Sequence, residues 1–167
     1  MPSFASKIET GTISSKVLGA DVTYNVYLPD GFDAAKHHYP VIYLLHGLSD
    51  TYTAWIEKGN MHLVADELMR SGECVPAVIV MPNAGGPDTR NTWNGYFNMP
   101  GWNYEDFFFE EFVPAVESKY NAGGSKGQRA VMGLSMGGGG STVYCQRHPD
   151  FFASCYAMSE WLDNERN

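Results

Sequence analysis

The stretch "VMGLSMGGGG", residues 131–140, decides the fold of this chain. It contains a Gly-x-Ser-x-Gly motif centred on Ser135, with a short apolar run before it and a glycine tract after it. We expect a buried strand up to the serine, a sharp turn, and a helix that begins directly afterwards. Such a turn forces the serine into a strained backbone conformation, and the flanking glycines remove Cβ atoms that would clash. This context predicts that Ser135 is a nucleophile.

Two alternative interpretations of the motif fit the context less well. A glycine-rich turn with an incidental serine needs neither a buried strand before it nor a helix after it. A phosphate-binding loop needs a Gly-Lys-Ser/Thr sequence, which this stretch lacks.

Apolar runs on both sides of this stretch predict an alternation of strands and helices. Strands are predicted over 22–32, 39–47, 75–83, 128–135 and 151–159. Helices are predicted over 60–72, 103–120 and 136–149. Pro114 should bend the second of these helices or begin a new one. Buried strands that alternate with helices indicate a single α/β domain over 1–167, with a mainly parallel sheet and helices on both faces.

An acyl-transfer site also needs backbone N–H groups that stabilise a developing oxyanion. One donor is expected at Met136, the residue after the nucleophile, at the positive end of the helix dipole. The other is expected from "LLHGLSD", residues 44–50, with Leu48 as the first choice and Gly47 as the fallback. His46 is the one histidine predicted near the carboxyl edge of the sheet. We expect its ring to shape this loop through hydrogen bonds rather than to act as a base.

The overall composition excludes several classes of partner. The 167 residues are 44% hydrophobic and 18% charged, as is ordinary for a globular domain. The formal net charge of −8 argues against nucleic acid or an anionic membrane, since both attract basic proteins. The sequence has neither an apolar run of membrane-spanning length nor the features of a signal peptide. The compartment stays open, with a secreted or periplasmic location favoured over a cytoplasmic one.

The three cysteines, Cys74, Cys145 and Cys155, have no metal-ligand spacing, and their odd count argues against a complete disulfide framework. We expect free thiols that are buried or half-buried. A Cys145–Cys155 bridge remains an alternative that the sequence does not decide. No His/Cys/Asp cluster has ligand spacing, so we expect no metal and no cofactor.

Four stretches, in their order and spacing, resemble the α/β-hydrolase esterase family: "HGLSDTYTAW" (46–55), "VIVMPNAGG" (78–86), "NYEDFFFEEFVPAVESKY" (103–120) and "VMGLSMGGGG" (131–140). That family includes feruloyl and acetylxylan esterases of carbohydrate esterase family one, S-formylglutathione hydrolases of the esterase D type, and mycolyltransferases. The resemblance implies a Ser-His-Asp mechanism with Ser135 as nucleophile and the amides of Leu48 and Met136 as oxyanion donors. It also implies that the loop around Trp93–Trp102 is part of the substrate cleft.

The chain departs from this family where the acid and the histidine should follow. In these hydrolases the acid and then the histidine come after the nucleophile in the chain, but His148 is the single histidine after Ser135. If the intervening segment is helical, a rise of ~1.5 Å per residue puts His148 about 18 Å from the turn, too far for a base. The remaining histidines are expected to be solvated or packing residues: His37, His38 and His62.

Asp163 and Glu160 are candidates for the acid, with a solvated chain end as the alternative reading of both. The simplest account is that this chain is the N-terminal two-thirds of an esterase, without the last strands, the acid and the base. Loss of those strands would uncover a sheet edge. We therefore expect a homodimer or strand exchange through that edge.

The aromatic side chains of Trp93, Tyr96 and Trp102 suit an aromatic acyl group or sugar rings, with packing onto the core as the alternative. We assign them, with His46 and Gly47, to substrate binding. The expected function is a serine ester hydrolase acting on small-molecule or polysaccharide-linked esters, chiefly feruloyl, cinnamoyl or acetyl esters of plant polysaccharide. A short-chain carboxylesterase or S-formylglutathione hydrolase is the enzymatic alternative. A catalytically incompetent hydrolase fragment is the alternative from another class.

Overall fold

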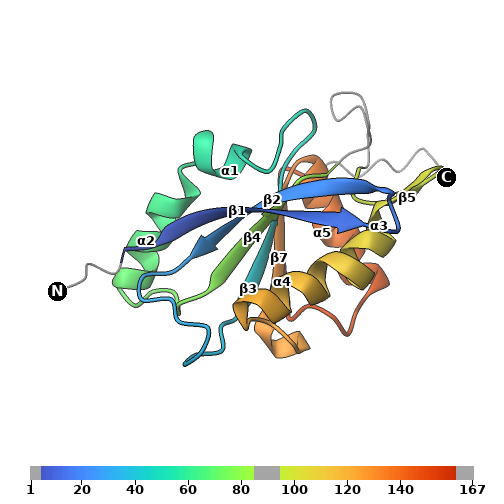
Figure 1. The fold of residues 1–167 in the computed structure, drawn as a ribbon. Coiled ribbons are helices and arrows are strands. Elements are labelled where there is room, and N and C mark those ends of the chain that lie inside the picture. Colours follow the sequence, from blue (N-terminus) through green and yellow to red (C-terminus); the bar gives the residue numbers. More distant parts are fainter. Residues whose placement is uncertain (1–4, 85–94, 161–167) are drawn as a thin grey trace.

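Six strands form the central sheet in the order β1-β2-β4-β3-β7-β8 (Figure 1). The computed structural model describes residues 5–84 and 95–160. β3, β4, β7 and β8 run parallel to one another, while β2 is antiparallel to both β4 and β1. The bounds of the strands are β1 Lys7–Ser15, β2 Ala20–Leu28, β3 Val41–Leu45, β4 Val78–Pro82, β7 Arg129–Leu134 and β8 Ser154–Met158.

Helices cover both faces of the sheet, as Figure 1 shows. Alternate residues of β3 explain why both faces need a cover. Ile42 and Leu44 belong to the apolar cluster that contains Ala65 of α2, whereas Tyr43 and Leu45 belong to the larger cluster beneath α3, α4 and α5. The helices are α1 Ala54–Glu57, α2 Met61–Arg70, α3 Tyr104–Phe107, α4 Val113–Tyr120 and α5 Met136–Arg147, with a short 3-10 turn η2 at Lys126–Gln128.

The segment from α3 to α4 contains a π-helical turn, η1, at Phe108–Phe112. Pro114 lies in the first turn of α4, where its missing N–H costs no hydrogen bond. The sequence predicts that Pro114 either bends the helix or begins a new one. In the structure α3, η1 and α4 follow one another directly, and Pro114 lies just after the π-helical turn without interrupting the helical segment. Phe108 and Phe112 are fully buried with their rings stacked 5.7 Å apart. The aromatic residues of this segment thus build part of the core.

Five strands and three helical segments occur where the sequence predicts them, and the α/β fold class is confirmed. The sequence did not predict β1, α1 or the small hairpin of β5 (Asn98–Met99) and β6 (Trp102–Asn103). β1 has the sequence "KIETGTISS" and is exposed or half-exposed along most of its length. A strand with so few apolar residues gives almost no periodic signal.

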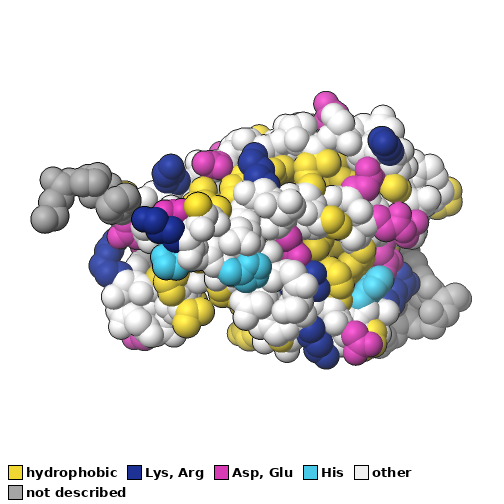
Figure 2. All heavy atoms as spheres, turned by 60° about the horizontal axis from the view of Figure 1, so that its bottom comes forward, with side chains coloured by type: hydrophobic (Ala, Val, Ile, Leu, Met, Phe, Trp, Pro, Cys, Tyr) yellow, Lys and Arg dark blue, Asp and Glu magenta, His cyan; other side chains and the backbone are white. Residues whose placement is uncertain are grey.

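β8 is an edge strand, because among the described residues it pairs with β7 alone. Its first three residues, Ser154, Cys155 and Tyr156, are exposed, and Tyr156 keeps 60% of its surface accessible. On the face shown in Figure 2, acidic and basic side chains are interspersed, and hydrophobic side chains also reach the surface. None of the described helices has the length and apolar character needed to cross a membrane.

Candidate active site

Ser135 occupies the turn between β7 and α5 in a conformation that non-glycine residues rarely adopt, with φ 56° and ψ −112°. Its backbone is held on both sides. The Ser135 N–H donates to the carbonyl oxygen of Met158 at 2.8 Å, and its own carbonyl accepts from the N–H of Gly139 at 3.0 Å. The strained conformation predicted for the serine is present, and strain of this kind is typical of functional sites.

Steric contacts explain both glycines of the motif. A Cβ added to Gly133 would lie 2.0 Å from the carbonyl oxygen of Gly137, across the turn. A Cβ added to Gly137 would lie 2.3 Å from the carbonyl oxygen of Leu45, at the end of β3. Real Cβ atoms do not approach backbone atoms so closely, so only glycine lets the turn close and α5 dock against β3.

The loop after β3 brings Gly47 beside Ser135. Asp50 donates its backbone N–H to the carbonyl of Gly47 at 3.2 Å, and Ser49 takes the left-handed φ of 68°, as in a type II turn. A Cβ added to Gly47 would lie 3.6 Å from the Cβ of Ser135. Leu48 lies in this turn, 38% exposed.

Met136 is the first residue of α5, with its side chain buried. The first N–H groups of a helix have no intrahelical partner and lie at the positive end of the helix dipole. The start of α5 and the loop after β3 thus both adjoin Ser135, and the N–H groups of Leu48 and Met136 stay the predicted oxyanion donors.

His46 has both ring nitrogens engaged by backbone groups. Nε2 accepts from the N–H of Ala84 at 3.0 Å, so Nδ1 carries the proton and donates to the carbonyl of Gly47 at 2.8 Å. The residue is 3% exposed, and burial lowers the pKa of its imidazole. His46 is thus a neutral residue that holds the loop, as we expected. It lines the hollow beside Ser135 but has no free nitrogen for a substrate.

His148 and His38 form hydrogen bonds with groups other than Ser135. His148 follows the far end of α5, where Nε2 lies 3.0 Å from Oε1 of Glu105 and the ring stacks on Phe109 with a 3.8 Å centroid separation. His38 contacts Asn121 and the carbonyl of Gly123. All five histidines are among the described residues, and no hydrogen bond joins any of them to Ser135 there.

The assignment of Tyr96 to substrate binding is wrong. Tyr96 is fully buried, its hydroxyl donates to the carbonyl of His46 at 2.7 Å, and its carbonyl accepts a short hydrogen bond from the hydroxyl of Tyr144. Gly140 packs closely here, because a Cβ would lie 3.0 Å from the Tyr96 ring, which would have to shift to admit it. Tyr96 therefore supports the loop after β3 through the carbonyl of His46. This agrees with the alternative interpretation of the aromatic residues, packing onto the core.

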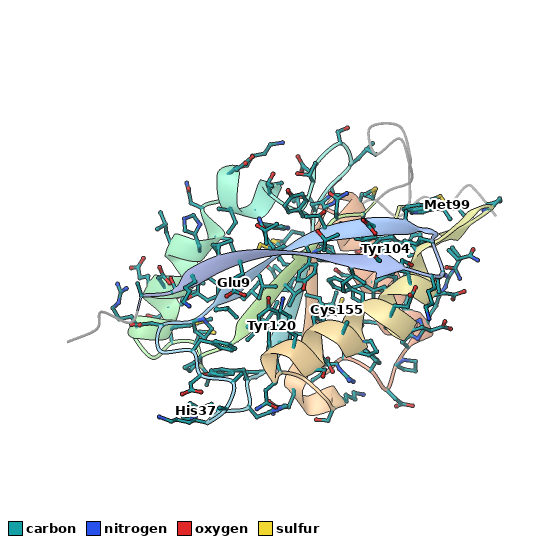
Figure 3. All side chains as sticks on the ribbon, viewed as in Figure 1. Glu9, His37, Met99, Tyr104, Tyr120 and Cys155 are labelled. Atoms are coloured by element: carbon teal, nitrogen blue, oxygen red, sulfur yellow. The ribbon has the colours of Figure 1, made fainter. Side chains whose placement is uncertain are left out.

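The neighbouring aromatic residues differ in their surroundings. Tyr104, labelled in Figure 3, is also fully buried and donates its hydroxyl to the carbonyl of Asn83 at 2.7 Å. Trp102 is half-buried against the core in β6, close to Met99 at the outer end of the hairpin in Figure 3. Trp93 lies outside the described residues.

The candidates for an acid and for a disulfide can also be placed. Glu160 follows β8 and accepts a 2.5 Å hydrogen bond from Oγ1 of Thr142 on α5, while Asp163 lies outside the described residues. The three cysteines are free thiols, and burial together with contact to Cys155 raises the pKa of Cys145 to about 12. Within 5–84 and 95–160, no group of three or more metal-ligating side chains is gathered.

Comparison with known proteins identifies the family and the fold. The model of the Esterase family matches residues 15–165 of this chain. The chain belongs to the Esterase family. A ferulic acid esterase of known structure is 50% identical, superposes with a TM-score of 0.89, and is matched over 95% of this chain and 60% of its own. The central sheet with its helices is therefore an α/β-hydrolase fold.

Two further esterase relatives agree with this assignment. The structure of a ferulic acid esterase of carbohydrate esterase family one from Anaeromyces mucronatus is 26% identical, with a TM-score of 0.79 over 94% of this chain and 60% of that one. An endo-1,4-beta-xylanase/feruloyl esterase from Xylanibacter ruminicola is 31% identical over 149 residues, which are 87% of this chain and 20% of that protein. The present chain thus spans about 60% of the length of these two solved structures.

Proposed function

We propose that this esterase-family chain provides the nucleophile and the oxyanion hole of a serine ester hydrolase. The observation that carries the proposal is the conformation of Ser135, held at φ 56° between two glycines that no other residue can replace. The fold alone does not require a serine in such a strained conformation. A serine that acts as a nucleophile at a strand-to-helix turn does require it.

The proposed reaction uses the groups around this turn. Ser135 Oγ attacks the ester carbonyl carbon while a general base takes its proton, and the carbonyl oxygen becomes an oxyanion. The backbone N–H groups of Leu48 and Met136 stabilise that charge. Collapse of the intermediate breaks the bond to the alcohol, which leaves with the proton, and an acyl group remains on Ser135. Water, activated by the same base, then releases the carboxylic acid and restores the serine.

The general base is the part of this reaction that the chain's own histidines do not supply. His46 has no free ring nitrogen, and His148 interacts with Glu105 beyond the other end of α5. We therefore propose that the base comes from polypeptide outside the described residues. The carboxylate of Glu160 already accepts from Thr142, so we propose the same origin for the acid.

Esters of plant polysaccharide, with feruloyl or acetyl groups, are the proposed substrates. The support comes from the relatives, because two similar solved structures are named ferulic acid esterases and a similar sequence combines a xylanase with a feruloyl esterase. Hydrolysis of such an ester gives a carboxylic acid and a free sugar hydroxyl.

A second candidate function is a hydrolase fold without autonomous catalysis. It is favoured by one observation, the lack of any hydrogen bond between Ser135 and a histidine among the described residues. Removal of one triad member from a serine hydrolase lowers kcat by several orders of magnitude. The two candidate functions predict different effects of an added base on the rate of ester hydrolysis.

Addition of imidazole separates the two candidates. We expect imidazole to accelerate hydrolysis of p-nitrophenyl acetate and methyl ferulate by this chain, because it can take the proton of Ser135. The control is Ser135→Ala, which shows the hydrolysis due to imidazole alone. Equal rates for the parent chain and Ser135→Ala at every imidazole concentration would favour the incompetent fold.

A further inference from the structure

A hollow of about 170 Å³ lies between α1 and the turn that carries Ser135. Leu134, the residue before the serine, forms one wall, and Ala54 and Trp55 of α1 form the apolar wall opposite. Its position at the carboxyl ends of β3 and β7 is where ligands bind in open α/β sheets. A group of the substrate that enters this hollow would contact Leu134, the residue before the proposed nucleophile, and Gly47 of the loop after β3.

Two charged side chains of opposite sign, Asp50 and Lys58, also line the hollow. The ammonium group of Lys58 forms a short ion pair with Oδ1 of Asp50. The other oxygen, Oδ2, lies 3.5 Å from the point where a Cβ on Gly47 would be, and the Cβ of Ser135 lies 3.6 Å from the same point. Asp50 and Ser135 thus flank one glycine of the oxyanion loop.

The charges of this pair limit the chemistry of its ligand. An anionic group would meet the carboxylate of Asp50, and a cationic group would meet the ammonium of Lys58. A neutral hydroxyl can donate to the carboxylate and accept from the ammonium at once, and hydrogen bonds to charged groups are stronger than those between neutral ones. The indole of Trp55 gives a flat apolar surface for the ring that carries such a hydroxyl.

We propose that the Asp50–Lys58 pair is a specificity determinant that binds a ring hydroxyl of the ester substrate in this hollow. The inference rests on the proposed ester hydrolase function and names what its site selects. The hydroxyl belongs to a phenolic acyl group, such as a feruloyl group, or to a sugar of the alcohol part, and both present the same donor and acceptor.

Ligand binding to the Ser135→Ala chain tests the proposal without any turnover. Isothermal titration calorimetry compares methyl ferulate with methyl 3,4-dimethoxycinnamate, in which the phenolic hydroxyl is capped. Methyl xyloside serves as the probe for a sugar hydroxyl. We expect methyl ferulate, methyl xyloside or both to bind, and methyl ferulate to bind about 5-fold more tightly than its capped analogue if the hydroxyl is phenolic.

Variants of the pair decide between recognition and mere support of the loop. Lys58→Met alters an exposed side chain and should leave the fold intact. If the hydroxyl is phenolic, Lys58→Met and Asp50→Ala should each reduce the ratio of affinities for methyl ferulate and its capped analogue to about 1. If the hydroxyl is that of a sugar, each variant should bind methyl xyloside about 5-fold more weakly. The matched control pair, Asp33 and Lys36, forms a surface ion pair whose removal should change neither quantity.

Three results would overturn the proposal: no binding of either hydroxyl-bearing probe, equal affinity for the capped and uncapped esters without xyloside binding, or a hydroxyl preference that survives both substitutions. A structural role alone would weaken capped and uncapped ligands equally. These measurements do not depend on the chemistry of Ser135. Failure of the hydroxyl preference and failure of Ser135 as a nucleophile are therefore seen in separate experiments.

Discussion

The α carbon of Gly137 faces the carbonyl oxygen of Leu45 so closely that a methyl group added there would lie 2.3 Å from that oxygen. This contact joins the start of α5 to the end of β3. It fixes the distance between the turn that carries Ser135 and the loop after β3 that carries Gly47 and Leu48. The site therefore depends on backbone packing between two segments about 90 residues apart.

Gly137→Ala should destabilise the protein by about 1–3 kcal/mol, because the added methyl group must push two backbone segments apart. Urea unfolding followed by circular dichroism measures the change. The matched control is Gly127→Ala, since a Cβ at Gly127 would meet nothing within 4 Å. Equal midpoints for the two variants would contradict the packing described for this contact.

The lowered pKa of His46 makes the folded state sensitive to mild acid. Burial favours the neutral imidazole, so below the ordinary histidine pKa of about 6.5 the unfolded chain binds a proton that the folded chain refuses. Stability should therefore be constant with respect to His46 above pH 6.5 and fall as the pH decreases below it. His46→Gln should be less stable at pH 7.5 but should show a flatter pH dependence between pH 7 and 5.5.

The pKa of His38 is shifted in the opposite direction, so His38 serves as a control for the pH dependence attributed to His46. Hydrogen bonds to the carbonyl of Gly123 and to Asn121 raise the pKa of His38, so its contribution is present at low pH and is lost as the pH rises. His38→Gln should therefore steepen the loss of stability on the acid side. A pH profile that neither substitution changes would show that other groups control acid sensitivity.

The buried ion pair of Glu117 and Arg129 should be the most costly charged interaction to break. Arg129 Nε lies 2.7 Å from Oε1 of Glu117, whose side chain is 8% exposed and also accepts from the N–H of Gly124. Arg129→Met leaves a buried carboxylate without its cation and should cost about 3–5 kcal/mol. Lys36→Met, which breaks an exposed pair, should cost less than about 1 kcal/mol. Chemical denaturation of both variants measures the difference.

Among residues 5–84 and 95–160, no strand pairs with the outer edge of β8, which leads us to expect self-association. β8 contains no charged residue and no proline, the features that usually prevent edge strands from pairing. Tyr156→Lys places a charge on a side chain of β8 that is 60% exposed and should shift the chain toward the monomer. Light scattering after size-exclusion chromatography, at several protein concentrations, gives the mass of each form. A parent chain that is monomeric at all concentrations would contradict this expectation.

The sequence predicted the features of the site that depend on local geometry. A serine forced into a left-handed turn needs small neighbours, so Gly133 and Gly137 could be interpreted without knowing their partners. The buried strands were predicted from their continuous apolar runs, and the helix after the serine from the Gly-x-Ser-x-Gly context.

Features that depend on distant partners could not be predicted. Tyr96 was assigned to the substrate because a tyrosine in a long irregular segment suits either role. Its burial depends on the carbonyl of His46, 50 residues earlier in the chain, and on Tyr144, 48 residues later. Likewise, no feature of the sequence indicated a partner for Gly138, where a Cβ would lie 3.0 Å from the Cβ of Glu160.

Reaction with a fluorophosphonate probe, followed by mass spectrometry of the peptides, tests most directly whether Ser135 is the nucleophile. We predict a single adduct on Ser135, formed faster when imidazole is added, and no adduct in Ser135→Ala. An adduct confined to another residue, or no adduct on the folded chain even with imidazole, would contradict the account.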